Sequence, residues 1–164
     1  SFEEGTREAK LCANLYTVTL EDLLQLYPWR FATVQNQLPK LTKEPLFGFR
    51  HAYQLPPKML RILATDSGQN YRQFEDTLFS NAQSLRLTYI QRPDENRLPA
   101  YFVRVVELKM AEILALALQE DATKSRLMAE KAQAQILRAR GIDAQQQTTP
   151  LLDDSNFPLT QVRS

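Results

Sequence analysis

The chain of 164 residues is poor in the side chains from which catalytic and metal sites are built. It has one histidine, His51, and one cysteine, Cys12. No His pair or His and Cys cluster can therefore hold a transition metal, no internal disulfide can form, and a Ser-His-Asp triad would have to use His51. We expect His51 to lie at a sheet edge and Cys12 to be a buried, inert thiol. No cofactor is expected.

Glycine, net charge and long apolar runs are scarce as well. The four glycines lie far apart, so no local run can form a phosphate-binding loop. Twenty basic and nineteen acidic side chains leave a net charge of +1, far from the basic excess of dedicated nucleic-acid binders. The longest apolar run, near residues 110–118, is shorter than the roughly 20 residues of a membrane span. No export segment is visible, so a cytoplasmic origin is expected.

Adjacent carboxylates occur at four places, each at an expected helix end, turn or tail. These pairs are Glu3-Glu4, Glu75-Asp76, Glu120-Asp121 and Asp153-Asp154. General acid and base catalysis needs carboxylates that face each other across a cleft, and neighbours on a turn rarely do so. We interpret them as solvated capping and turn residues, and we predict no catalytic residue. The basic and aromatic mixture at 86–92 could stack nucleic-acid bases, but the alternation of a strand explains it equally well.

Helical periodicity predicts three long helices. Apolar residues recur at helical spacing over about residues 3–27. A second helix is expected over about 98–119, and a third over about 123–140, with Gly141 as its left-handed stop. The second half of the middle helix is apolar almost all the way round. Such a helix has to be enclosed by its own domain or by neighbouring subunits.

Short segments of alternating character replace the helical pattern between about residues 33 and 92 and predict a small antiparallel sheet. Hairpin connections are expected at 66–70 and at Glu75-Asp76, and Pro39 favours an edge strand. The predicted fold class is α+β: a bundle of long α-helices with an inserted small antiparallel β-sheet and an extended C-terminal arm. Residues 1–144 would form a single domain and residues 145–164 the arm.

The single tryptophan lies where the first helix should end. Pro28 cannot continue the helix, which we therefore expect to stop near Tyr27. We interpret Tyr27, Pro28, Trp29 and Phe31 as a structural corner between the first helix and the sheet, with the indole N–H bonded locally. The alternative is a ligand-binding role for Trp29.

Residues 145–164 show no periodic element but carry several large apolar side chains. They are Leu151, Leu152, Phe157, Leu159 and Val162, with Arg163 next to the last. Burying each contributes about 1.5 to 3 kcal/mol, whereas fixing the backbone costs about 1 to 2 kcal/mol per residue. One arm alone would therefore dock weakly, and an assembly of many copies would remove that weakness through effective concentration. We predict these six residues to form an interface.

Several short motifs follow one another in an order and spacing typical of a known family. They are an acidic lead at 3–9, Tyr27-Pro28-Trp29-Arg30-Phe31-Ala32, the segment from Tyr53-Gln54-Leu55-Pro56 to Leu63, Leu87-Thr88-Tyr89-Ile90, and Ala139-Arg140 in a charged final helix. Over nearly the whole chain, this pattern resembles the head-to-tail adaptor family of tailed bacteriophages, best known as tail tubular protein A in short-tailed phages. The chain departs from the family at Lys58, where an acidic residue is usual. It also lacks the family's helix before Ser1, so we expect its start to be missing.

The resemblance implies a structural virion protein and not an enzyme. The protein would assemble in the host bacterial cytoplasm as a twelvefold ring in the neck of the virion, below the portal, through which the genome passes. Its implied partners are further copies of itself, the portal protein and the tail nozzle or tube protein, with transient, non-specific contact to DNA and no membrane. The arm residues Leu151 to Arg163 would reach the portal or an adjacent protomer.

Two alternatives from other functional classes stay open. One is a cell-wall (peptidoglycan) hydrolase of the phage neck or tail, with Glu75 and Asp76 as acid and base. The other is a non-viral helical module that binds a partner protein. Incubation with peptidoglycan separates the first from an adaptor, and the mass of the assembly separates the second.

Overall fold

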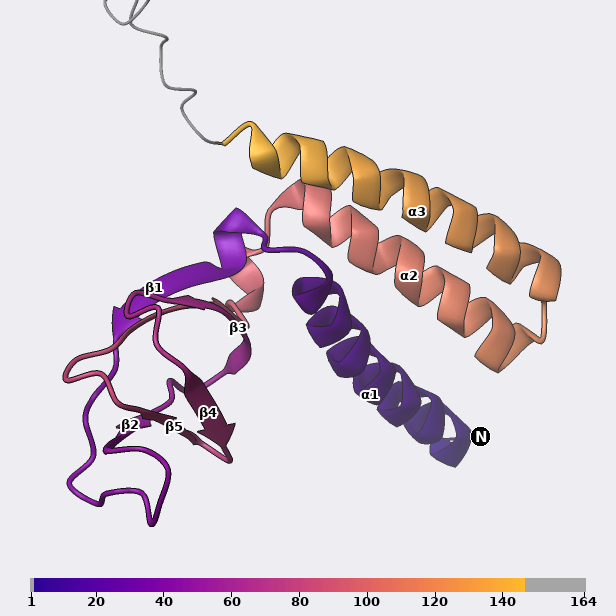
Figure 1. Ribbon diagram of the computed structural model, residues 1–164. Helices are drawn as coiled ribbons and strands as arrows, with labels where there is room; N and C mark the ends of the chain where they lie inside the picture. The colour runs from indigo at the N-terminus through magenta and orange to yellow at the C-terminus, as the bar shows by residue number, and fades with distance from the viewer. Residues whose placement is uncertain (1, 147–164) are drawn as a thin grey trace, which may run out of the picture.

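The computed structural model of the chain describes the backbone of residues 2–146 and the side chains from Thr6 onward. Long helices occupy one side of the molecule, and two small sheets occupy the other (Figure 1). The helices are α1 (Phe2–Leu26), α2 (Ala100–Gln119) and α3 (Ala122–Ala144), with short 3-10 helices η1 (Arg30–Ala32) and η2 (Glu95–Arg97). The strands are β1 (Thr33–Gln37), β2 (His51–Gln54), β3 (Met59–Thr65), β4 (Tyr71–Phe74), β5 (Thr77–Ser80) and β6 (Arg86–Gln91).

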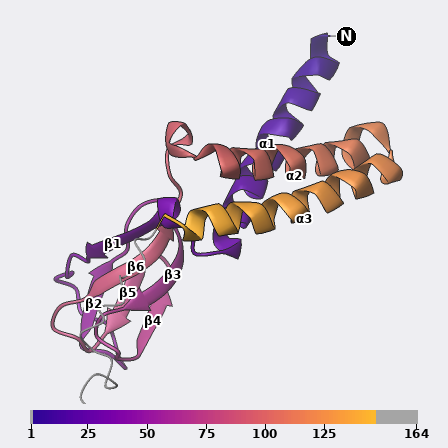
Figure 2. The ribbon, with the colours of Figure 1, turned by 90° about the horizontal axis from the view of Figure 1, so that it is seen from above.

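The prediction of a bundle of long helices with one inserted sheet is wrong, although the α+β composition holds. The helices α2 and α3 pack side by side along their length, but α1 crosses α2 and runs away from the pair (Figures 1 and 2). Only the last turns of α1 carry fully buried apolar side chains, which are Leu20, Leu23 and Leu24. From Thr6 to Val18, α1 has no buried side chain, so the three helices do not share one bundle core along their length.

The hairpin of α2 and α3 is held together by small residues and a tight turn. Ala115, Ala132 and Ala139 are buried along it, and small side chains allow two helix backbones to approach closely. Glu120 takes a left-handed conformation with φ 50°. The side chain of Asp121 then caps α3 by accepting a hydrogen bond from the backbone N–H of Lys124 at 2.8 Å.

The helix α3 does not stop at Gly141 as predicted. It continues through this glycine to Ala144, and Gly141 is not among the residues with positive φ. A glycine in a helix lowers its stability but does not break it, and the helix ends in a turn at Gln145. The extra turn brings the Asp143 carboxylate to the point where the helices meet the strands.

The strands form two antiparallel three-stranded sheets in place of the single sheet predicted. One has the order β1-β6-β3 and the other β2-β5-β4. The sheets enclose a core that includes Leu78, Leu85, Leu87 and Tyr89. A second core joins the helices to Ile90 of β6. The central strand β6 therefore contributes side chains to both cores.

The strand β3 also serves both cores, because its pairing with β6 is irregular. Strict alternation would place every second side chain on one face of the sheet. The pairing shifts between Met59 and Arg61 and again between Ile62 and Ala64. As a result Met59 and Ile62 pack between the sheets, while Leu60 and Leu63 pack against the helices. Bulges of this kind redirect side chains without ending a strand.

The two predicted hairpin connections have different outcomes. Glu75-Asp76 does join the paired strands β4 and β5, and Glu75 has the positive φ of 52° that such a tight turn requires. The prediction for 66–70 is wrong, because this segment links β3 to β4, which belong to different sheets. Its residues Asp66 and Gly68 are typical of a turn, but the sequence does not tell which strands a turn will pair.

Candidate functional site

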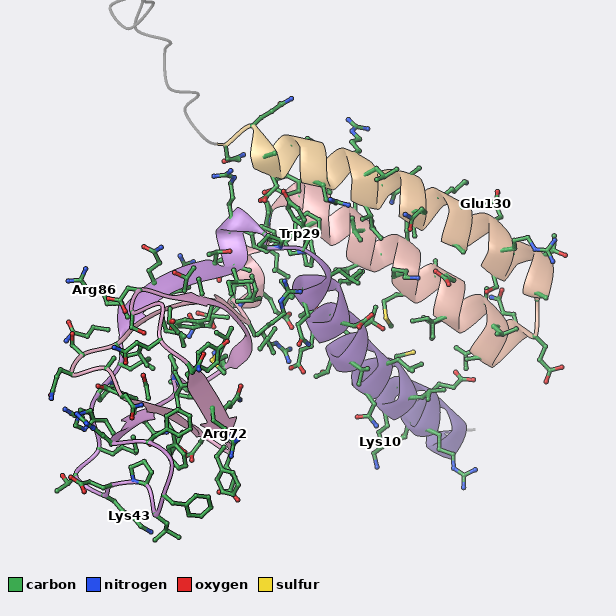
Figure 3. The ribbon with its side chains drawn as sticks, in the orientation of Figure 1. Lys10, Trp29, Lys43, Arg72, Arg86 and Glu130 are labelled. Atoms are coloured by element: carbon green, nitrogen blue, oxygen red, sulfur yellow. The ribbon has the colours of Figure 1, made fainter. Side chains whose placement is uncertain are left out.

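An aromatic cluster lies where the helices meet the strands (Figure 3). We call it the junction cluster, and it consists of Tyr27, Trp29, Phe31, Tyr101 and Phe102. Trp29 is fully buried, and its ring centroid lies 5.1 Å from that of Tyr27 and 5.2 Å from that of Phe102. Its indole Nε1–H donates a hydrogen bond to the backbone oxygen of Leu23 at 2.9 Å. A buried indole satisfied in this way packs and does not offer a ligand site.

Further contacts around the corner join α1 to α3 and to the sheet. Pro28 is exposed, in keeping with its role of ending α1. The guanidinium of Arg140 lies over the Tyr27 ring, 4.7 Å from its centroid, which ties α3 to the end of α1. Outside the cluster, Arg92 bonds Glu21 at 2.8 Å and thereby links the end of β6 to α1. The corner is thus a structural junction of helices and sheet.

The buried Asp143 completes the junction. Its carboxylate accepts hydrogen bonds from the backbone N–H of Arg30, with N to O distances of 3.0 and 3.3 Å. It also accepts one at 2.9 Å from the hydroxyl of Tyr101. Burial of the phenol, assisted by this hydrogen bond and the charge of Asp143, raises the pKa of Tyr101 well above its usual range. The carboxylate therefore holds η1, α2 and α3 together.

Each of the three long helices leaves large apolar side chains exposed, and we call this set of side chains the helix face. Leu11 and Val18 of α1 are a full two turns apart and share one face of the helix. Val18 is 68% exposed, Leu116 of α2 57% and Leu137 of α3 58%. The second half of α2, which the sequence required to be enclosed, is therefore only partly covered by the described part of its own chain.

A shallow apolar hollow marks the place where α1 and α2 diverge. Its volume is about 240 Å³. The lining residues are Tyr16, Leu98, Val103, Val106, Glu107 and Met110. Beyond the hollow the two helices separate (Figure 1). The shape suits an inserted apolar side chain or helix better than a small polar ligand.

A second apolar surface lies on the outer face of the β2-β5-β4 sheet. It is a hollow of about 220 Å³, which we call the aromatic hollow. It is lined by Leu46, Phe47, Phe49, Arg72, Phe74 and Phe79. Leu46 is 92% exposed, Phe47 80% and Phe74 59%. Exposed aromatic side chains gathered in this way are typical of a protein-interaction surface.

The side chains with catalytic or metal-binding chemistry stay scattered in the described part of the chain. There, no group of three or more His, Cys, Asp or Glu residues is arranged to hold a metal ion. His51 begins the edge strand β2, and its buried Nε2 has no hydrogen-bond partner. Cys12 is half-exposed on α1, so the expectation of a buried thiol is wrong. Between residues 2 and 146, no helix has the length and apolar character needed to cross a membrane.

The two carboxylates that a peptidoglycan hydrolase would use as acid and base are both exposed. Glu75 and Asp76 lie on the turn between β4 and β5. The carboxylate of Asp76 accepts a hydrogen bond from Nε2 of Gln54 at 3.2 Å. Both also line a shallow hollow of about 480 Å³ with Lys58, which itself pairs with Asp94 at 3.1 Å. The two side chains are sequence neighbours on one turn and do not face each other across this hollow.

The predicted interface of the arm lies outside the described residues. This holds for Leu151, Leu152, Phe157, Leu159, Val162 and Arg163. The last described residues, Gln145 and Gln146, directly follow α3, whose last turn carries Asp143 with its hydrogen bond to Tyr101. The chain therefore leaves the described fold at the end of the helix that carries Asp143.

Neither a scan against models of protein families nor a search of curated proteins finds a match to this chain. The motifs that resemble the adaptor family map mainly onto the two cores. Trp29, Tyr53, Leu87, Tyr89 and Ala139 are all buried. Core residues of this kind determine packing, whereas function depends on the exposed sites. What the chain does has to be inferred from the helix face and the aromatic hollow.

Proposed function

We propose that this chain is a structural protein of a tailed-bacteriophage virion, a head-to-tail adaptor that forms a ring between the portal and the tail nozzle or tube. The observation that carries the proposal is the helix face, with Val18, Leu116 and Leu137 each more than half exposed. Large apolar side chains that stay exposed on all three long helices offer apolar area that contacts between copies can bury. Copies that pack against one another would cover this surface. The sequence resemblance supplies the viral setting.

Ring assembly suits the arrangement of the helices. The hollow between α1 and α2 and the exposed leucines of α3 belong to different surfaces of one protomer. If the α3 surface of one copy enters the hollow of the next, the contact joins unlike surfaces, and repeated contacts of that type close into a ring when the rotation permits. The helices do not form the bundle that the resemblance implied, so support comes from the exposed surface and the sequence motifs.

The charge of the chain is compatible with a channel for DNA. A net charge of +1 gives little overall attraction to phosphate. A ring built from such copies would make transient, non-specific contacts with a passing genome and would not retain it. The protein would act mechanically in the virion, without a cofactor and without chemistry of its own.

The test is the mass of the assembly. Native mass spectrometry and light scattering would be performed on the full chain, alone and with a purified portal protein of a short-tailed phage. We expect a ring-sized species, formed alone or on the portal. Val18→Glu and Leu137→Glu should weaken it at least about tenfold, because each places a charge in an apolar contact.

Gln133→Glu is the matched control for Leu137→Glu. It adds the same charge one turn away on the same helix but removes no apolar group. Equal effects of the two α3 variants would mean that charge alone acts and that the helix face is no interface. A chain that stays monomeric in the presence of the portal would overturn the adaptor proposal. The same chain in a small complex with another partner would favour the non-viral helical module.

The hydrolase alternative is tested with purified peptidoglycan. We expect the chain to release no soluble fragments, and Glu75→Gln and Asp76→Asn to behave as the unmodified chain. Release that disappears in either variant would make the protein an enzyme and would refute the proposal of a purely structural role.

A further inference from the structure

The aromatic hollow is built on a regular pair of strands. Arg72 of β4 lies directly opposite Phe79 of β5, so both side chains project from one face of the sheet. Phe74, two residues along β4, projects from the same face. Its ring is stacked on that of Phe79, with centroids 6.2 Å apart. The ring centroid of Phe49 lies 6.5 Å from that of Phe79. Backbone pairing thus fixes the position of the hollow.

The hollow lies beside an open sheet edge. In the order β2-β5-β4, the strand β4 is an outer strand, and no other strand of residues 2–146 pairs with its free side. All four of its residues are exposed. An exposed edge offers unpaired N–H and C=O groups to an extended segment. Edge and hollow together have the form of a site for strand addition, in which the backbone provides affinity and the pocket provides specificity.

The lining of the hollow defines the chemistry of its ligand. Five of its six residues are aliphatic or aromatic, and the only charged one is Arg72. An apolar cavity with a single guanidinium at its margin fits large apolar side chains followed by a carboxylate. The chain itself contains such a sequence, Leu151-Leu152-Asp153-Asp154.

We propose that the segment 147–164 of one copy docks at the aromatic hollow of a neighbouring copy. Leu151 and Leu152 bind among the phenylalanine rings, and Asp153 and Asp154 pair with Arg72. The segment lies along the free edge of β4. This inference rests on the self-association in the proposed function, but it does not depend on the viral role.

A neighbouring copy is the partner we propose, because Leu151 and Leu152 follow the end of α3 after only a few residues. From Gln146 to Leu151, five residue steps extend at most roughly 18 Å. The end of α3 lies at the junction, beside η1 and β1 (Figures 1 and 2). The hollow lies on the opposite side of the sheets, toward the end of the molecule marked by Arg72 and Lys43 in Figure 3. Two sheets stacked about 10 Å apart stand between them, and the chain would have to go round both.

The contact that results joins unlike surfaces. Each copy presents one segment and one hollow, so every copy can both donate and accept. Such a contact propagates around a ring until it closes. In a closed ring all segments bind at once, which offsets the weak docking of a single segment.

The first experiment uses a fluorescent peptide of residues 147–164. The receptor is the full chain with Leu151→Ser and Leu152→Ser, so that its own segment does not compete. We expect saturable binding by anisotropy, reduced at least about tenfold when the receptor also carries Phe74→Ser. Circular dichroism checks that the receptors fold. Absence of binding, or equal binding to both receptors, overturns the proposal.

The second experiment exchanges the charges. Arg72→Glu alone and Asp153→Lys with Asp154→Lys alone should each weaken self-association, while the three changes together should restore most of it. Arg86→Glu is the matched control, because it makes the same charge change on the other sheet (Figure 3). Weakening by Arg86→Glu as large as that by Arg72→Glu, or no restoration in the combined variant, overturns the pairing.

The third experiment separates neighbouring from internal docking. One chain carries Phe74→Ser, and the other carries Leu151→Ser with Leu152→Ser. We expect neither variant by itself to associate through this contact. Their mixture should form pairs, because the Phe74→Ser chain supplies an intact segment and the Leu151→Ser, Leu152→Ser chain supplies an intact hollow. No pairing in the mixture overturns docking between copies. If rings form normally in all these variants but not in Val18→Glu, this inference fails and the proposed adaptor ring stands.

Discussion

The junction cluster and the aromatic hollow use the same side chains in opposite ways. In the junction, Trp29 is fully buried and hydrogen-bonded, and its neighbours are held by Asp143. In the hollow, Phe74 and Phe79 stack in regular geometry, yet Phe74 is more exposed than buried and Arg72 is the only charged lining residue. Ring contacts alone therefore do not distinguish a core from a binding surface.

The difference lies in what surrounds the rings. Elements from three parts of the sequence close over the junction cluster: the end of α1, the start of α2 and the end of α3. The aromatic hollow is lined by side chains of one sheet and one connecting segment. No further element of the described chain lines its outer side. Aromatic area that is already buried stabilises the fold, whereas area that is still exposed can stabilise a complex. The comparison predicts different responses to substitution.

The largest expected effect is at the centre of the junction. Trp29→Ala removes the ring that contacts Tyr27 and Phe102 and leaves the backbone oxygen of Leu23 without its donor. We expect the free energy of unfolding to fall by about 3 to 5 kcal/mol. Urea denaturation of the unmodified and variant chains measures this change. A loss below about 1 kcal/mol, typical of a surface site, would break the distinction between the two clusters.

Asp143→Ala should have the next largest effect. The substitution leaves the backbone N–H of Arg30 without the carboxylate and removes the partner of the Tyr101 hydroxyl. Unsatisfied buried groups cost about 1 to 3 kcal/mol each, so we expect a loss of that order in urea denaturation. Asp143→Asn, which keeps the shape and one acceptor, should lose less. Equal losses would mean that the negative charge of the carboxylate, and not its shape or a single acceptor oxygen, stabilises the junction.

Tyr101 provides a pH test of the same junction. Its pKa in the folded chain is raised above the ordinary value of 10.0, first by burial and then by Asp143. As pH rises, the unfolded chain therefore releases the phenolic proton before the folded chain does, and stability present below about pH 10 is lost above it. We expect Tyr101→Phe to show a shallower loss of unfolding free energy between about pH 9 and pH 11. If the unfolding free energy of both proteins falls equally steeply with pH, Tyr101 does not contribute to the loss of stability at alkaline pH.

The helix spans were largely predictable because helical periodicity is a local property. The spans 3–27 and 98–119 end within a few residues of α1 and α2. How the helices pack was not predictable, since the sequence does not say which apolar stripes meet within one chain and which stay exposed. Leu20 is buried near the end of α1, whereas Val18 of the same helix remains exposed. The distinction depends on contacts between distant segments.

The candidate site was less accessible from the sequence than the fold. The sequence predicts the Glu75-Asp76 turn, but it does not by itself show that Phe74 and Phe79 of the adjoining strands share an outward face. Alternation offered the signal, because Leu78 is buried between the sheets and its neighbour Phe79 must face the other way. The sequence does not predict the role of Asp143, because an end of the third helix at Gly141 would leave Asp143 outside it. A glycine terminates a helix only when the following contacts favour a left-handed turn.

Gly141→Ala sharpens this point with a smaller effect. Gly141 lies inside α3, its φ is not positive, and an added Cβ would meet nothing within 4 Å. Alanine should therefore stabilise the helix, and with it the position of Asp143, by up to about 1 kcal/mol. Gly68→Ala is the matched control, because Gly68 has a φ of +60° and equally open surroundings. That change should destabilise the chain. Thermal or urea unfolding of the two variants should move in opposite directions.

The smallest effect on stability is expected in the aromatic hollow. Phe47 is 80% exposed, so the folded chain already leaves most of its ring in water. Phe47→Ser should change the free energy of unfolding by no more than about 0.5 kcal/mol, as is usual for surface positions. The same change should weaken binding of the 147–164 peptide, because the ring becomes buried only when the hollow is occupied. A variant that binds normally but unfolds easily would show that the hollow is part of the core after all.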